Sequence, residues 1–200
     1  MTTHTLKPSF QDWLRPLVKR MAGWGVTANQ VTIAAPVGSL VLCAALMLAW
    51  PRQWPFLFLP VWFFLRLALN AMDGMLAREH GQESKLGALM NEMGDVISDA
   101  ALFAPFAFVP EFGPYWIGLV IFLSTLSQFA GTLGATIGAG RRFEGPLGKS
   151  DRAIVFGVLG LWVGLELPLP SWAWLIMLAL SALLIVTAYN RLRAALKATA

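Results

Sequence analysis

The chain has 200 residues, of which 57% are hydrophobic and only 13% are charged, and its formal net charge is +4. Because a soluble domain carries about 25% charged residues, this composition predicts an integral membrane protein and excludes an ordinary soluble enzyme. A single cysteine, Cys43, excludes both a disulfide framework and a cysteine-based zinc site.

The N-terminal segment, residues 1–28, is predicted to form an amphipathic helix that lies in the membrane interface. Its apolar side chains recur at helical spacing and lie opposite Lys19 and Arg20. Pro16 lies inside this helix and predicts a kink. The apolar positions are Phe10, Trp13, Leu14, Leu17, Val18 and Met21.

Six apolar segments follow, each near the roughly 20 residues that a membrane-spanning helix needs. The connections between them are short and rich in proline and glycine, as turns between antiparallel helices should be. The chain is therefore predicted to be an all-α membrane protein of six transmembrane helices. The predicted spans are about 31–50, 54–76, 86–109, 114–140, 152–168 and 171–190, within a transmembrane domain over 29–190 that precedes a basic cytoplasmic tail over 191–200.

Basic residues are distributed unevenly about these six spans. Thirteen of the fifteen Lys and Arg fall on one side, Arg52 falls on the other, and Arg66 lies inside a span. The positive-inside rule makes the basic side cytoplasmic, so both termini are predicted to be cytoplasmic in the cell's inner membrane. The positive charge then reflects topology, and no nucleic-acid partner is expected.

The second and third predicted spans each carry polar residues along one helical face, at spacings of three or four residues. An ionisable group inside a membrane costs about 2.5–3.5 kcal/mol and usually marks function. Carboxylates and amides suit Mg²⁺ or Mn²⁺, and Arg78 at the water boundary can pair with a phosphate. Together they predict phosphoryl-type transfer at a membrane surface. The polar positions are Arg66, Asn70 and Asp73 on the second span, and Gly87, Asn91, Asp95 and Asp99 on the third.

This pattern resembles the signature of the CDP-alcohol phosphotransferase family, D-x2-D-G-x2-A-R-x8-G-x3-D-x3-D. Six of the eight signature positions match, including the eight-residue gap, and the exceptions are Asn70 and Asn91. Residues Asn29 and Thr32 also resemble the Asn-x-x-Thr pattern with which the family begins its first span. The eight positions are Asn70, Asp73, Gly74, Ala77, Arg78, Gly87, Asn91 and Asp95.

The resemblance implies six transmembrane helices behind an interfacial helix, usually in a homodimer. It implies transfer of a phosphatidyl group from CDP-diacylglycerol, or a similar CDP-alcohol, to a small alcohol or phosphorylated alcohol, with release of CMP. Asp95 would be the base that activates the alcohol. Mg²⁺ or Mn²⁺ would be held by Asp73, Asn70, Asn91 and Asp95, and CDP by Gly74, Ala77, Arg78, Gly87, Asn29 and Thr32.

The two asparagines change the expected metal site, because a four-aspartate site carries four negative charges and this one carries two. We therefore expect one tightly held metal ion or two weakly held ions, with Glu92 able to move into the gap. One alternative is a catalytically degenerate protein that binds CDP-lipid or nucleotide. A small transporter is disfavoured, because beyond Asp99 the third span is apolar.

Two further polar groups have competing interpretations. Arg66 and Asp99 should lie at similar depth and form a buried ion pair that fixes the helix register, although Asp99 could instead be a metal ligand. In the basic loop before the fifth span, Lys149 and Arg152, with Asp151 as a neighbour, are candidates for binding the acceptor alcohol. The alternative for this loop is topology combined with contact to anionic lipid, and the identity of the alcohol is not predicted.

Overall fold

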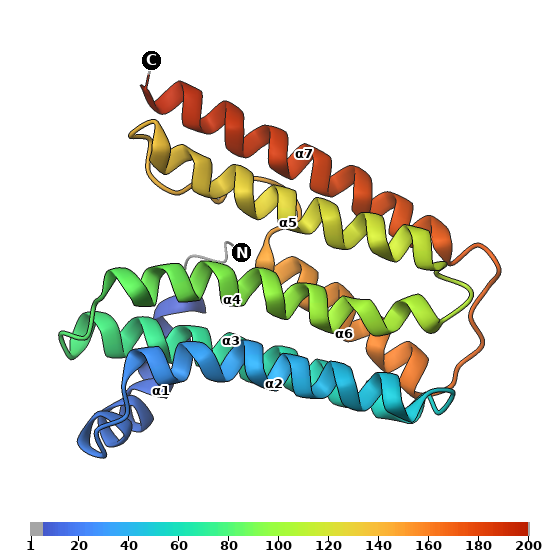
Figure 1. Cartoon of the computed structure of the whole chain (residues 1–200), viewed down its shortest axis with the longest axis horizontal. Helices are drawn as coiled ribbons and strands as arrows, with labels where there is room; N and C mark the ends of the chain where they lie inside the picture. Colours follow the sequence, from blue (N-terminus) through green and yellow to red (C-terminus); the bar gives the residue numbers. More distant parts are fainter. Residues whose placement is uncertain (1–5, 200) are drawn as a thin grey trace.

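The computed structural model describes residues 6–199, and the ordered elements are all helical, as predicted. Figure 1 shows most helices running along one another, with the first helix placed across one end of the bundle. At that end lie the α3–α4 turn and the C-terminus, and the α2–α3, α4–α5 and α6–α7 connections lie at the other. The helices are α1 Leu6–Gly23, α2 Ala28–Ala49, α3 Phe58–Glu79, α4 Lys85–Phe103, α5 Pro114–Thr136, α6 Lys149–Gly164 and α7 Trp174–Thr199, with short 3-10 helices η1 Trp54–Leu57 and η2 Ala104–Phe108.

Within residues 6–199, four helical segments are long and apolar enough to cross a membrane: α2, η1 with α3, α5 and α7. Helices α4 and α6 fall outside this group, because α4 carries several charged residues and α6 has only 16 residues. Both lie inside the assembly, where α4 packs against α2 and α5 while α6 packs against α3. The structure therefore shows four long apolar candidate spans and does not show six.

Three helix boundaries differ from the sequence-based prediction. The α-helical part of the third predicted span ends at Phe103 and continues as η2, because Pro105 has no N–H for the α-helical hydrogen bond. Helix α6 begins at Lys149, ahead of the expected residue 152. Helix α7 continues unbroken to Thr199, so residues 191–199 belong to this helix and do not form the separate tail expected there.

Helix α1 has the predicted amphipathic character and continues as one helix through Pro16. Its buried side chains Leu14 and Val18 pack with residues of α3, whereas Trp13 is 69% exposed. At the surface, Arg15 donates hydrogen bonds to Glu79 at the end of α3. These hydrogen bonds and the negative charge of Glu79 raise the pKa of Arg15. Apolar packing and these surface hydrogen bonds therefore hold helix α1 beside the last turn of α3.

The apolar core is packed largely by aromatic rings from α3, α4, η2 and α6. Phe103 and Phe156 stack with ring centroids 3.7 Å apart, and Phe106 meets Phe156 edge to face at 5.3 Å. Close approach of α6 to the start of α3 requires glycine, because a Cβ on Gly164 would lie 2.7 Å from the backbone nitrogen of Leu57. This packing holds α6 against α3 and brings its N-terminal end toward α4.

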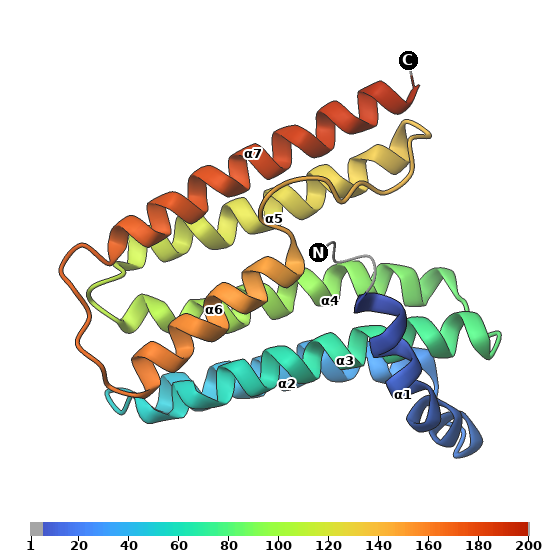
Figure 2. The ribbon, with the colours of Figure 1, turned by 180° about the vertical axis from the view of Figure 1, so that it is seen from behind.

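The loop over residues 137–148 sets how deep α6 begins. It turns back along α5 before entering α6, as Figure 2 shows in yellow and orange. The backbone N–H of Arg142 donates to the carbonyl of Gly131 on α5 at 2.9 Å, and that of Leu147 donates to Oγ1 of Thr187 on α7 at 3.1 Å. Leu147 is buried. Lys149, the first residue of α6, consequently lies beside the middle of α4, well inside the bundle.

Candidate functional site

A pocket of about 590 Å³ opens where α2 begins, α3 ends and α4 begins, a volume within the range typical of small-molecule sites. Asp73 and Asn91, two of the expected metal ligands, also line it. The sequence-predicted spacing thus brings residues from three helices around one cavity. All six residues expected to contact CDP line the pocket: Asn29, Thr32, Gly74, Ala77, Arg78 and Gly87.

The start of α2 is fixed against the pocket by local hydrogen bonds. Thr27 and Gln30 form a capping box at its N-terminus, which satisfies backbone donors that the first helical turn leaves free. The N–H of Ala28 donates to Oε1 of Gln82 in the α3–α4 turn at 2.6 Å. One turn further, Oγ1 of Thr32 donates to Oδ2 of Asp73 at 3.0 Å. Helix α2 is therefore tied both to the turn and to the carboxylate of α3.

Two glycines leave room in the pocket for other groups. A Cβ on Gly87 would lie 2.6 Å from Oδ1 of Asn29 and 2.9 Å from Oγ of Ser84, so any larger residue here would displace these two side-chain ends from their places at the pocket. A Cβ on Gly74 would lie 3.2 Å from the guanidinium nitrogens of Arg78. The exposed Arg78 side chain can therefore lie over the backbone of α3 at the pocket.

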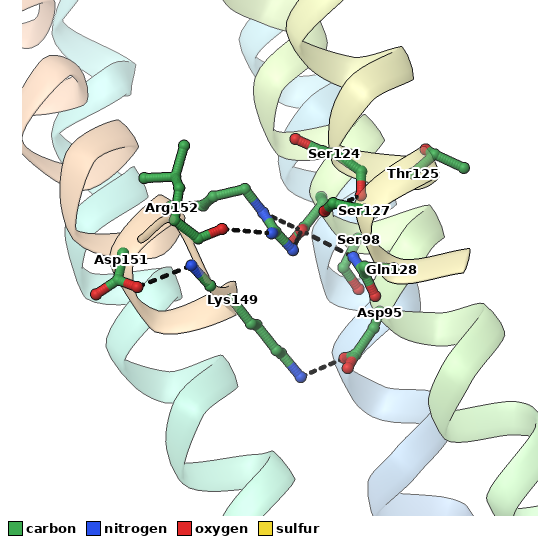
Figure 3. A network of polar contacts seen from close by, with 12 residues as sticks. Asp95, Ser98, Ser124, Thr125, Ser127, Gln128, Lys149, Asp151 and Arg152 are labelled. Carbon is green, nitrogen blue, oxygen red and sulfur yellow. Dashed lines mark hydrogen bonds and ion pairs between the residues drawn. The ribbon is translucent and has the colours of Figure 1, made fainter. Parts of the chain in front are cut away.

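Asp95 is buried and does not line the pocket. The ammonium group of Lys149 contacts its Oδ1 atom, and Nη2 of Arg66 lies 3.5 Å from the same oxygen. Figure 3 shows Lys149 reaching from the start of α6 toward Asp95 on α4. Of the residues expected to bind the acceptor, Lys149 is therefore the one that faces Asp95.

Asp99 lies one helical turn beyond Asp95 and is surrounded by donors. The expected contact with Arg66 is formed, with Nη1 of Arg66 2.5 Å from Oδ1 of Asp99. Oδ2 accepts hydrogen bonds from Nε and Nη2 of Arg152, at 3.0 and 2.7 Å, and from Nε2 of Gln128 at 3.2 Å. Asp99 is therefore the centre of a buried Arg–Asp–Arg group and is fully engaged by protein donors.

Arg152 and Asp151, two of the residues expected to bind the acceptor, both have partners within the protein. The Arg152 side chain is only 1% exposed and is bound to Asp99, because the path of the preceding loop carries it deep into the bundle. The carboxylate of Asp151 accepts the N–H of Gly148 at 2.8 Å and caps α6. Glu92, which could have approached the asparagines, forms an ion pair with Arg141 instead. No local spacing in the sequence indicated that Arg152 would be buried against Asp99.

The donor set at the signature positions does not fit a cluster of divalent ions. Asp73 accepts from Thr32, and Asp95 is engaged by Lys149 and Arg66. Among residues 6–199 the buried Nδ2 atom of Asn70 has no hydrogen-bond partner. Over residues 6–199 no group of three His, Cys, Asp or Glu side chains is arranged to hold a metal.

The fold and the pocket together define an all-helical protein with several candidate membrane spans and a polar site at one end of the bundle. Residues 25–185 match the CDP-alcohol phosphatidyltransferase family. The chain therefore belongs to this family, in agreement with the resemblance of its signature.

Similar proteins include the inner membrane protein YnbA of Escherichia coli K12, which is 46% identical over 98% of this chain and 97% of its own length. Two crystal structures of Mycobacterium tuberculosis phosphatidylinositol phosphate synthase share the fold. The complex with manganese and citrate has a TM-score of 0.73 at 21% identity, covering 90% of this chain and 88% of that chain. The complex with CDP-DAG has a TM-score of 0.69 at 19% identity, covering 90% and 92%.

Proposed function

We propose that the chain transfers a phosphatidyl group, or a similar substituted phosphate, from a CDP-alcohol to an alcohol acceptor and releases CMP. The observation that carries the proposal is the pocket at the ends of α2, α3 and α4, because all six residues expected to contact CDP line it. CDP-diacylglycerol is the proposed donor, since the related mycobacterial synthase has been crystallised with CDP-DAG bound. Its lipid chains would extend between the apolar helices into the bilayer.

In this reaction the acceptor hydroxyl oxygen bonds to the β-phosphorus of the donor, and the bond from that phosphorus to the bridging oxygen breaks. CMP leaves with the bridging oxygen, and the hydroxyl proton passes to Asp95. Lys149 and Arg66 both approach Oδ1 of Asp95, so Oδ2 is the atom proposed to take the proton. Arg78 would bind the diphosphate as a charged hydrogen-bond donor.

The proposed topology is six transmembrane helices, with the pocket and both termini on the cytoplasmic side. Helices α4 and α6 would complete the four apolar candidate spans, because their charged side chains face one another inside the bundle, where such groups are tolerated in membranes. The ends of α1, α3, α4 and α7 that carry basic residues lie at the pocket end (Figure 1), which supports this orientation. A homodimer is proposed from the family resemblance alone.

A second candidate function is a non-catalytic protein that binds CDP-lipid. The contact of Lys149 with Asp95 favours it, because it occupies one oxygen of the carboxylate that would have to accept the proton.

The two functions are separated by incubating the purified full chain with CDP-diacylglycerol labelled in the cytidine, with and without Mn²⁺, and a panel of alcohols and phosphorylated alcohols. We expect labelled CMP with at least one acceptor. Asp95→Asn should abolish CMP release and leave CDP binding nearly intact, whereas Arg78→Ala should weaken CDP binding. The matched control Arg193→Ala removes an exposed cation on α7 and should change neither quantity. CDP-lipid binding without CMP release under any condition would establish the binding protein instead.

A further inference from the structure

The place of Lys149 conflicts with the metal site that the sequence predicts. Asp95 is expected to share a divalent ion, yet in the structure its Oδ1 atom contacts the Lys149 ammonium group, and Nη2 of Arg66 lies 3.5 Å away. The remaining signature carboxylate, Asp73, accepts a hydrogen bond from Thr32 at 3.0 Å. A protein cation therefore stands beside the carboxylate that a metal ion would need.

Lys149 is held in this position by its surroundings. Leu147, two residues earlier, is buried and bonded through its N–H to Thr187 of α7. Asp151 caps the first turn of α6, and Arg152 is bonded twice to Asp99. The side chain of Lys149 is 29% exposed. Its backbone therefore has one well-defined place, and its ammonium group reaches Asp95 without a rearrangement of the loop.

The charges of the group balance without any metal ion. It contains three carboxylates and three cations, all of them buried or partly buried, so its formal charge is zero. Its charged neighbours Glu92, Arg141 and Arg191 add one negative and two positive charges, so the surroundings contribute no excess of negative charge. With aspartate at positions 70 and 91 the same group would carry two additional negative charges. The two asparagines and Lys149 thus both make the net charge of the site less negative, so that protein side chains alone can neutralise it. The six residues are Asp73, Asp95, Asp99, Arg66, Lys149 and Arg152.

We infer that Lys149 supplies to Asp95 the positive charge that the full aspartate signature would assign to a divalent ion, so that the resting protein holds no divalent ion on Asp95. A cation placed there would meet both Lys149 and Arg66 at short distance, and like charges in a partly buried site repel strongly. The inference takes from the proposed function only the location of the CDP-alcohol. Its test measures ion binding and does not require the protein to catalyse a reaction.

The test is Mn²⁺ binding to the purified full chain in detergent, followed by the electron paramagnetic resonance signal of free Mn²⁺. Wild type should bind at most one ion per chain. Lys149→Gln should bind Mn²⁺ at least about tenfold more tightly than wild type, because even at an effective dielectric constant of about 20 a unit charge a few ångströms away strongly opposes the ion. Lys149→Arg keeps the charge and should behave as wild type.

Two controls make the change specific. Lys197→Gln removes an exposed cation near the end of α7 and should leave the Mn²⁺ affinity unchanged. Asp95→Asn combined with Lys149→Gln removes the carboxylate as well and should lose the gain in affinity. Size-exclusion chromatography and thermal unfolding check that each variant is folded.

Equal Mn²⁺ affinity in wild type and folded Lys149→Gln, including the absence of binding by both, would overturn the inference. Saturation of wild type with two ions per chain would also overturn it. If Lys149→Gln does not fold, the number of Mn²⁺ ions bound per wild-type chain is the measurement that tests the inference. CMP release is assayed separately. Its absence with the expected Mn²⁺ results refutes only the proposed transfer reaction, whereas CMP release with unchanged Mn²⁺ affinity refutes only the inference about Lys149.

Discussion

Replacing Arg66 with methionine, which retains much of its length, tests how the charge of Asp99 is balanced. The substitution removes the 2.5 Å contact between Nη1 of Arg66 and Oδ1 of Asp99, and with it the 3.1 Å hydrogen bond from Nη2 of Arg66 to the carbonyl of Asp95. A hydrogen bond to a charged group contributes about 1.5–3 kcal/mol. Because Arg152 still donates two hydrogen bonds to Asp99 and Lys149 still contacts Asp95, the cost of Arg66→Met should be about that of one or two such hydrogen bonds.

The double variant Arg66→Met/Asp99→Leu gives the sharper result. If Arg66 and Asp99 formed an isolated pair, neutralising both would restore most of the stability. In the structure Asp99 is also the partner of Arg152, whose side chain is only 1% exposed. Loss of one partner of a buried ion pair costs about 3–5 kcal/mol, so the double variant should remain about that much less stable than wild type.

Adding Arg152→Met removes the last unpaired charge and should recover most of this loss, since replacing a whole buried ionic group by apolar side chains is often neutral. The free energy of unfolding would be measured by titration with sodium dodecyl sulfate in mixed micelles, followed by circular dichroism. Arg193→Met, an exposed control on α7, should change it by no more than about 0.5 kcal/mol. Wild-type stability in the double variant would refute the shared role of Asp99.

Three further outcomes follow from packing. Gly87→Ala should lower CDP affinity, because its Cβ would lie 2.6 Å from a side-chain oxygen of α2 and would displace that side chain within the pocket. Gly118→Ala, a control within α5 with open space around it, should leave CDP affinity unchanged and should not lower the thermal unfolding temperature. Leu14→Ala should cost about 2–5 kcal/mol, because Leu14 is buried against α3, and the exposed Leu17→Ala should cost little in the same unfolding assay. Leu147→Ala should destabilise the protein by a similar amount, because Leu147 is buried and its N–H is bonded to Thr187. It should also loosen the start of α6, which would appear as faster amide hydrogen exchange over residues 149–152. Unchanged exchange there would contradict the anchoring role of Leu147.

The sequence predicted the pocket well because its residues lie on short helical repeats. Asp73, Gly74 and Arg78 share one stretch of α3, and Gly87 and Asn91 are one turn apart on α4. Such spacings fix which face of a helix a side chain occupies, and the short α3–α4 turn brings the two faces together. The contact of Arg66 with Asp99 followed from the same counting of residues from the turn.

The contacts of α6 could not be predicted in this way. The sequence offered Lys149, Asp151 and Arg152 as candidates for an acceptor site in a cytoplasmic loop, and it indicated none of the contacts that they make. In the structure Lys149 contacts Asp95, Asp151 caps α6 and Arg152 is buried against Asp99. Their depth depends on a loop that turns back along α5. Nothing in the local pattern of residues 137–148 indicates that turn.

The sequence by itself therefore determined the helical class and the polar faces of α3 and α4, because these depend on composition and on the period of one helix, and its signature spacing indicated the family. Only the tertiary structure decided which cations neutralise the carboxylates of α4. Those partnerships depend on hydrogen bonds between distant segments, from Arg142 to Gly131 and from Leu147 to Thr187, which fix where α6 begins. A loop that started α6 one turn nearer the surface would leave the same sequence motif in place and would remove Lys149 and Arg152 from Asp95 and Asp99.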